Sequence, residues 1–137
     1  MNFIENDVLS GEIVPVLLGA SPEGNRTARR LFGRYHVLSH LFCESVPFSA
    51  RLTCCMKFHV IRHTSGDSLM LTALLDFARQ LGQADLILYL IPCTPDYANF
   101  VWRNREALEC NYVIADQPEM DKVWFGDQTN GKEVNES

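Results

Sequence analysis

The feature that most constrains the fold of this chain is Leu86–Ile91, an unbroken apolar run of strand length. The run is far shorter than the roughly 18 residues that suggest a membrane-spanning helix. Its side chains do not alternate between apolar and polar, so a strand formed by them would be covered on both faces. Strands of parallel sheets are covered in this way, because helices pack on both sides of the sheet. We therefore predict that Leu86–Ile91 is a central strand of a parallel sheet.

Segments with helical periodicity lie on both sides of this run. The segment before it starts at Gly66-Asp67-Ser68 and stops at Gly82, a residue type that commonly ends helices. After the run, Thr94 is a suitable N-cap and Pro95 a suitable first helical residue, which predicts a helix to about Glu109. The apolar residues of the first segment recur at the spacing of one helical face. They are Met70, Ala73, Leu74, Phe77, Ala78 and Leu81.

The rest of the chain adds one helix and four strands to this pattern. Asn25 is the expected N-cap of a helix over residues 26–34. Strands are expected at residues 13–18, 36–41, 57–61 and 112–115, with a long loop at 43–55. The order β-α-β-β-α-β-α-β implies right-handed crossovers between parallel strands. We predict an α/β fold: a Rossmann-like, three-layer domain with a mostly parallel five-stranded sheet over residues 13–115, an N-terminal extension at 1–12 and a polar C-terminal tail at 116–137.

Charge and composition exclude several classes of function. The 137 residues carry a net charge of −5, with 47% hydrophobic and 21% charged residues, which is typical of one globular domain. The acidic balance argues against nucleic acid and against an anionic membrane, since binding to either needs clustered basic residues. Residues 1–12 contain no Lys or Arg, whereas a secretory signal needs a positive N-terminal region. We therefore expect a cytoplasmic protein whose five cysteines are reduced thiols.

The turn after the first strand is the expected place for a ligand, because ligands bind at the carboxyl ends of strands in open α/β sheets. Its sequence, Gly19-Ala20-Ser21-Pro22-Glu23-Gly24-Asn25-Arg26, has neither the dinucleotide-binding nor the phosphate-loop spacing. Backbone amides at the start of the next helix could still hold an anion. On the loop alone, the simpler interpretation is that Gly19 and Gly24 only shape the turn.

No motif predicts a catalytic or metal site. His36 and His40 are four residues apart, as are His59 and His63, and on a strand this spacing separates two residues by about 13 Å. That distance is too long for one zinc ion with bonds of about 2 Å. We interpret the histidines as core or satisfied polar residues, and the adjacent Cys54-Cys55 as packing residues rather than a redox pair.

The last predicted helix carries polar residues with simple interpretations. Glu106 and Glu109 lie close in sequence to Arg103 and Arg105, a spacing that favours solvated ion pairs over an acid–base couple. Asn104 falls within the apolar stripe of the helix. Because a buried asparagine needs hydrogen-bond partners, we expect it to bond a loop and fix its shape. The alternative is a position at the solvent rim.

Several short motifs follow one another along residues 13–125. They are Gly19 to Ala28-Arg29, Ser49-Ala50-Arg51, Leu90-Ile91-Pro92-Cys93-Thr94-Pro95-Asp96-Tyr97, Asn104-Arg105-Glu106-Ala107-Leu108, Tyr112-Val113-Ile114 and Asp121-Lys122. In this order they resemble the N-terminal, pre-ATP-grasp domain of ATP-grasp ligases. The nearest similarity is to carbamoyl-phosphate synthase large chains and D-aspartate ligase-like carboxylate–amine ligases. One departure is that Pro95 stands where many relatives have an aspartate, with Asp96 next to it.

The resemblance implies a stand-alone or truncated substrate-side domain of a carboxylate–amine ligase, without the catalytic ATP-binding domain. The alternative is a small-metabolite-binding or subunit-interaction module with no catalytic role. No catalytic residue is expected in the chain, and ATP and magnesium are expected only with a separate ATP-grasp domain. By the same resemblance the tail at 116–137, with Asp121-Lys122, corresponds to the start of that missing domain. A small carboxylate or phosphate would bind in one cleft at the carboxyl ends of the strands. The residues expected around this cleft are Gly19, Ser21, Asn25, Arg29, Ser49, Arg51, Thr94 and Asp96.

The surface after the last predicted strand is the expected assembly surface. In the larger ligases that the chain resembles, the next domain covers this surface. Here Tyr112, Val123, Trp124 and Phe125 would contribute apolar area to it. Contiguous apolar patches usually mark an interface. We therefore expect a homodimer, docking of the tail onto its own domain, or an ATP-grasp partner subunit at this surface.

Overall fold

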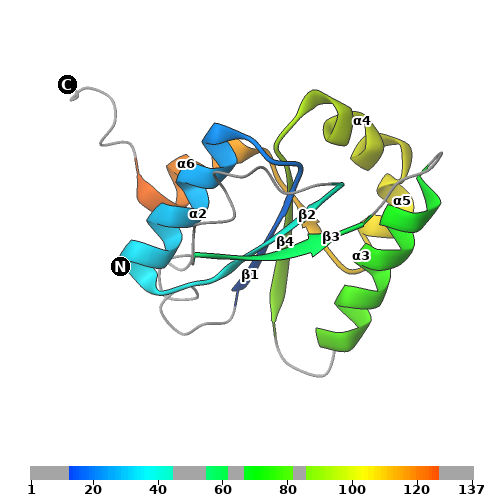
Figure 1. Ribbon diagram of the computed structural model, residues 1–137, viewed down its shortest axis with the longest axis horizontal. Helices are drawn as coiled ribbons and strands as arrows, with labels where there is room; N and C mark the ends of the chain where they lie inside the picture. The colour runs from blue at the N-terminus through cyan, green and yellow to red at the C-terminus, as the bar shows by residue number, and fades with distance from the viewer. Residues whose placement is uncertain (1–12, 45–54, 62–66, 82–85, 127–137) are drawn as a thin grey trace.

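The protein is built on a five-stranded sheet in which all neighbouring strands are parallel (Figure 1). The computed structural model describes residues 13–44, 55–61, 67–81 and 86–126. The strands are β1 (Ile13–Leu18), β2 (Ser39–Cys43), β3 (Met56–Val60), β4 (Ile87–Pro92) and β5 (Val113–Ile114). Their order across the sheet is β3-β2-β1-β4-β5. The predicted α/β class with a parallel sheet is confirmed.

Helices cover both faces of the sheet, which gives the predicted three layers (Figure 1). One face carries α2 (Pro22–Tyr35) and α6 (Gln117–Phe125). The other carries α3 (Ser68–Leu81), α4 (Pro95–Arg103) and α5 (Arg105–Leu108). Two hydrophobic clusters follow from this arrangement, one on each side of the sheet. None of the helices described here combines the length and the apolar character needed to cross a bilayer.

The strand predicted at Leu86–Ile91 lies inside the sheet, as predicted, although β1 takes the middle position of the five. β4 lies inside the sheet between β1 and β5, and Leu90 and Ile91 are fully buried, so its apolar run does mark a strand covered on both faces. β1 takes the middle position because the chain extends the sheet through β2 and β3 on one side and returns to the other side for β4. Val16 pairs with His40 on one side and with Leu90 on the other.

The helix predicted before β4 is confirmed. It runs over Ser68–Leu81, and Met70, Leu74 and Ala78, three members of the predicted stripe, are buried against the sheet. Four-residue steps between them place the three side chains on one face of the helix. On the same helix Leu69, outside the stripe, is 50% exposed.

Helix α2 begins earlier than predicted and β2 begins later. Ser21, rather than Asn25, is the N-cap of α2, and its hydroxyl accepts a hydrogen bond of 2.9 Å from the Gly24 amide. Pro22 suits the first turn because its missing N–H leaves no helical bond unmade. At the other end His36 ends the helix with a left-handed φ of 60°, so the strand predicted from His36 starts only at Ser39.

The helix predicted over residues 94–109 is two helices that meet at Asn104. Thr94 is the N-cap, as predicted, and its hydroxyl accepts a hydrogen bond from the Tyr97 amide at 3.3 Å. Asn104 has a φ of −114°, outside the helical range, so α4 ends before it and α5 starts after it. Its side chain caps the break, because Nδ2 donates to the Phe100 carbonyl at 2.9 Å.

Residues 117–125 form helix α6, where a polar tail was predicted. Trp124 and Phe125 are buried in the cluster beneath α2, and the Tyr35 hydroxyl donates to the Trp124 carbonyl at 2.9 Å. Asp121 accepts a 2.6 Å hydrogen bond from the Thr27 hydroxyl and another of 2.6 Å from Gln117. The segment therefore docks onto its own domain, which was one of the three arrangements expected for this surface.

The packing of α3 gives a matched test of the fold. Leu74→Ala is expected to lower the free energy of unfolding by about 2–5 kcal/mol, because it leaves a cavity between α3 and the sheet. The control Leu69→Ala, five residues earlier on the exposed side, is expected to stay within about 0.5 kcal/mol of the wild type. Urea unfolding followed by far-UV circular dichroism measures both values. Equal losses in the two variants would contradict the placement of this helix.

Candidate ligand-binding site at the carboxyl ends of the strands

The candidate site lies where β1 and β4 end side by side. The chain leaves β1 towards β2 and leaves β4 towards β5, so the connections diverge at this point. The Leu18 carbonyl accepts a hydrogen bond of 2.9 Å from the Cys93 amide, and the Gly19 amide donates one of 2.9 Å to the Phe42 carbonyl. In open α/β sheets a divergence of this kind leaves a crevice that binds ligands.

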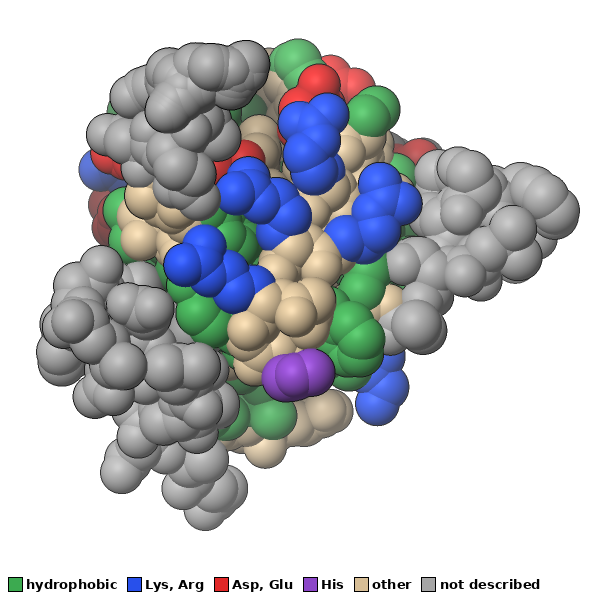
Figure 2. All heavy atoms as spheres, turned by 90° about the vertical axis from the view of Figure 1, so that its left-hand side faces the viewer, with side chains coloured by type: hydrophobic (Ala, Val, Ile, Leu, Met, Phe, Trp, Pro, Cys, Tyr) green, Lys and Arg blue, Asp and Glu red, His purple; other side chains and the backbone are tan. Residues whose placement is uncertain are grey.

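A first hollow of about 390 Å³ lies beneath the start of α2. Among the described residues its charged lining consists of Arg26 and Arg29, both exposed at the rim, and its floor includes Leu17 and Leu41 of the sheet. The described lining residues are Leu17, Gly19, Ala20, Ser21, Pro22, Gly24, Asn25, Arg26, Arg29, Leu41 and Met56. Figure 2 shows that basic side chains gather on the side of the molecule formed by α2 and α6. The hollow thus combines an apolar floor with a cationic rim.

The electrostatics of the first hollow favour a small anion. Of the first four residues of α2, Pro22 has no N–H, and Gly24 and Asn25 donate theirs to the hydroxyl and the carbonyl of Ser21, so the Glu23 amide is the backbone donor that remains. The helix dipole adds partial positive charge at this end. The side-chain oxygen of Asn25 is buried without a hydrogen-bond partner among the described residues. Glu23, also in the first turn, is exposed to solvent and does not line the hollow.

A second hollow, of about 560 Å³, lies on the other side of the same turn. It shares Gly19 and Ala20 with the first and is otherwise lined by α3, α4 and the end of β2. In the part of its lining that the structure describes, the carboxylates are Glu44, Asp67 and Asp96 and the basic side chain is Arg103. An anion is therefore disfavoured here compared with the first hollow.

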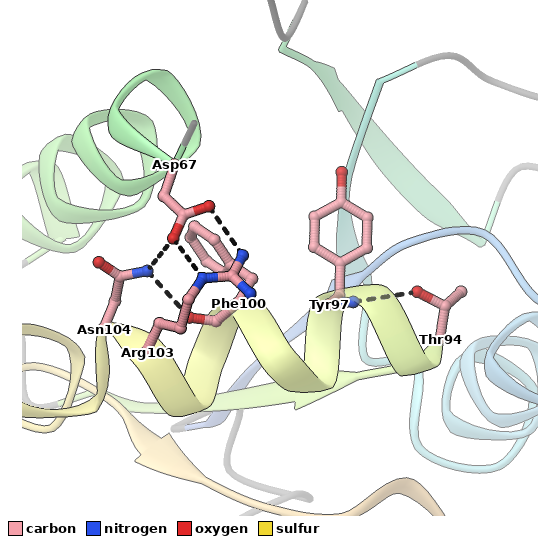
Figure 3. Close-up of polar contacts among 6 residues, drawn as sticks. All are labelled: Asp67, Thr94, Tyr97, Phe100, Arg103 and Asn104. Atoms are coloured by element: carbon pink, nitrogen blue, oxygen red, sulfur yellow. Dashed lines mark hydrogen bonds and ion pairs between the residues drawn. The ribbon is translucent and has the colours of Figure 1, made fainter. Parts of the chain in front are cut away.

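Tyr97 stands upright on α4 at the edge of the second hollow (Figure 3). Burial, with smaller contributions from the nearby carboxylates of Glu44 and Asp96, raises the pKa of its hydroxyl to about 12. The hydroxyl is therefore protonated at neutral pH. It can serve as a hydrogen-bond donor but not as a general base.

Asp67 ties α3 to the break between α4 and α5 (Figure 3). Arg103 donates two hydrogen bonds of 2.9 Å to the Asp67 carboxylate, one from Nε and one from Nη2. Nδ2 of Asn104 donates to the same carboxylate at 2.9 Å. Asn104, which was expected to bond a loop, is half-buried and bonds Asp67, the residue directly before α3. Arg103 had been expected in a solvated face with the helix glutamates but pairs with Asp67, whereas Arg105 pairs with Glu109 at 3.2 Å.

The structure divides the predicted site residues between the two hollows. Gly19, Ser21, Asn25 and Arg29 line the first, and Gly19, Thr94 and Asp96 line the second. The single predicted cleft is thus two hollows that meet at Gly19 and Ala20. The remaining predicted residues, Ser49 and Arg51, lie outside the described residues.

Both glycines of the turn are required by packing. Gly19 has a φ of 88°, and a Cβ on it would lie 2.7 Å from Cδ2 of Tyr97. A Cβ on Gly24 would lie 2.7 Å from Sγ of Cys93. These contacts bring the start of α4 and the end of β4 against the turn. The interpretation that the glycines shape the turn is therefore sufficient to explain both of them.

Cys93 is a residue of the site that sequence reasoning did not single out. It follows β4 directly, and its Sγ lies beneath Gly24 at the start of α2. Burial raises the pKa of the thiol to about 12, against the opposing effect of a hydrogen bond with Ser21. The thiol is therefore protonated at neutral pH and cannot act as a nucleophile. Its position directly after a buried strand was the one sequence signal that could have indicated a place near the site.

One histidine of each sequence pair contacts a histidine of the other pair. His40 on β2 and His59 on β3 lie on the face covered by α3, with Nδ1 of His40 3.0 Å from Nε2 of His59. Burial is the main cause that lowers the pKa of both rings, to about 4 for His40. His36 ends α2 and is exposed, and His63 lies outside the described residues.

No group of three or more His, Cys, Asp or Glu side chains within the described ranges is placed to hold a metal ion. Comparison with family models, with curated proteins and with solved structures gives no match for this chain. The interpretation of the site therefore rests on its geometry and charge. These favour reversible binding of a small anion in the first hollow.

The contact between Gly24 and Cys93 can be tested by a double-mutant cycle. Gly24→Ala is expected to lower the free energy of unfolding by about 1–3 kcal/mol, because its Cβ overpacks against the sulfur. Cys93→Ala removes that sulfur, so Gly24→Ala should cost clearly less in the Cys93→Ala background. Chemical unfolding of the four proteins gives the coupling free energy. Additive losses would show that the two residues do not meet.

The histidine pair predicts a defined pH dependence. Because the folded-state pKa of His40 lies near 4 and below its ordinary 6.5, the unfolded chain binds more protons between these values. The stabilisation that comes from burying the neutral rings is therefore fully present above pH ~6.5, and it is lost as the pH falls towards ~4. We expect His40→Gln to flatten the decrease in unfolding free energy over this window, and the exposed control His36→Gln to leave it unchanged. Identical slopes for the wild type and His40→Gln would contradict this.

Proposed function

We propose that this chain binds a small carboxylate or phosphate in the first hollow, as the substrate-side domain of an ATP-grasp carboxylate–amine ligase similar to carbamoyl-phosphate synthase large chains. The observation that carries the binding part is the cationic hollow at the end of β1, with Arg26 and Arg29 above an apolar floor. In this proposal the nucleotide and its magnesium belong to a separate ATP-grasp domain. The role of the present residues is to hold the acidic substrate.

The geometry supports this proposal by bringing three contributions to one place. The start of α2 offers the Glu23 amide and the positive end of a 14-residue helix. Arg29 offers a planar guanidinium that can bind a carboxylate or phosphate through two hydrogen bonds. The hollow lies at the divergence of the strand connections, the usual ligand position in this class of sheet.

The resemblance to pre-ATP-grasp domains adds the link to ligation. The motif that starts at Pro92, the last residue of β4, leads into α4, and Asn104-Arg105-Glu106 spans the break between α4 and α5. Asp121 and Lys122, which resemble the entry to the next domain, lie in α6. A partner domain would then approach from the side of α2 and α6, where the arginines are exposed.

The alternative is a subunit-interaction module with no catalytic role. Trp102 favours it, because this side chain is 70% exposed on α4 and carries the guanidinium of Arg105 at 4.8 Å from its ring. Tryptophan and arginine are the residue types most enriched at the energetic centres of interfaces. In that case the hollow would be a packing feature, and its arginines would bind no small ligand.

Anion binding is tested by thermal denaturation of the chain with inorganic phosphate, L-aspartate and magnesium-ATP. A ligand at about 100 times its dissociation constant stabilises a protein by about 2.7 kcal/mol, which gives a clear upward shift of Tm. We expect phosphate or aspartate to stabilise the wild type. Arg29→Gln should abolish the shift, and Arg34→Gln, an exposed arginine of the same helix outside the hollow, should retain it.

Two results would contradict the proposal. Equal shifts in Arg29→Gln and Arg34→Gln would mean that the anion binds elsewhere. Micromolar binding of magnesium-ATP, or phosphate release from ATP in the presence of a carboxylate and an amine, would mean that the chain itself is a nucleotide-dependent enzyme.

A further inference from the structure

The histidine pair on the α3 face of the sheet is separate from both hollows. β2 and β3 pair in a register that sets His40 opposite Lys57 and Phe42 opposite His59. His40 and His59 are therefore diagonal neighbours on one face, which brings their rings within contact distance. Their facing nitrogens, Nδ1 of His40 and Nε2 of His59, lie 3.0 Å apart.

We propose that His40 and His59 form a two-imidazole binding site for a divalent transition-metal ion of the zinc and nickel class. Imidazole nitrogen is a preferred ligand of these ions. Two nitrogens bound to one tetrahedral zinc at about 2.0–2.1 Å lie about 3.3 Å from each other. The observed 3.0 Å therefore needs to open by only a few tenths of an ångström, and each ring must also turn by about 35° so that its lone pair points at the ion rather than at the other nitrogen.

Aromatic neighbours hold the two rings beside each other. Phe42 stacks on His59 with ring centroids 4.3 Å apart and planes within 6°. Phe77 of α3 contacts both imidazoles, at 4.8 Å from His40 and 5.2 Å from His59. Rings that already lie next to each other lose little freedom when a metal ion binds. Both imidazoles remain partly exposed, so water can complete the coordination of the ion.

The protonation state of the pair suits a metal ion. Both rings are neutral at pH 7, and in the metal-free protein one ring donates its N–H to the facing nitrogen of the other. Metal binding needs both facing nitrogens free of protons. The shared proton therefore moves to the outward nitrogen of the donor ring, Nε2 of His40 or Nδ1 of His59, and no proton is released. Lys57, the charged side chain that acts on both rings, opposes the ion and moderates its affinity.

The test is a zinc chloride titration of the full chain, followed by the ¹⁵N resonances of the imidazole rings. In the wild type the facing nitrogens of His40 and His59 should move to the metal-bound range together, while the outward nitrogens become N–H. His40→Gln and His59→Gln should each weaken this binding by at least the roughly tenfold that loss of a supporting contact costs. The exposed His36 should not respond, and His36→Gln should bind zinc as the wild type does.

The wild-type spectra decide the matter even where a variant folds poorly. If zinc binds but the ¹⁵N resonances of the facing nitrogens of His40 and His59 do not shift, the proposal is wrong. The proposal is also wrong if zinc shifts the resonances of His36, or those of only one ring of the pair. The result says nothing for or against anion binding at α2, because the two sites share no residue.

Discussion

The main-chain hydrogen bonds at the end of β1 are the constraint on which the site depends. Leu18 accepts from the Cys93 amide and Gly19 donates to the Phe42 carbonyl, so the strand is held from both sides up to its last residue. The turn to α2 therefore starts from a fixed point beside the ends of β2 and β4. Because Gly19 has no side chain, the Tyr97 ring packs directly against the turn, and because Gly24 has none, so does the Cys93 sulfur. These two contacts set where α2 and α4 begin.

The docking of α6 determines which face of α2 remains open. Thr27, Ala28 and Leu31 are turned inward, where Thr27 bonds Asp121 of α6 and the two apolar residues join the core. Helical geometry then directs Arg26 and Arg29 outward at the rim of the first hollow. The cationic rim in a chain of net charge −5 is thus a consequence of how the two helices pack.

Local patterns predicted the parts of the fold that depend on neighbours in sequence. The stripe through Met70, Leu74 and Ala78 and the cap at Thr94 are of this kind, because each depends on residues within a few positions. The α6 helix and the meeting of His40 with His59 could not be found in this way. The first depends on burial of Trp124 under a distant helix, and the second on the register of two parallel strands, which no local pattern records. The division of the site into two hollows likewise depends on the side chain of Tyr97 above Gly19.

Anion binding at the start of α2 is the central claim, and backbone amide NMR during a titration with inorganic phosphate tests it most directly. The account predicts that the largest shift changes fall on the amides of residues 19–26 and on the Arg29 side chain, with saturation and a single dissociation constant. Changes spread evenly over exposed arginines such as Arg34 and Arg79, or centred on the acidic hollow around Asp67, would contradict it.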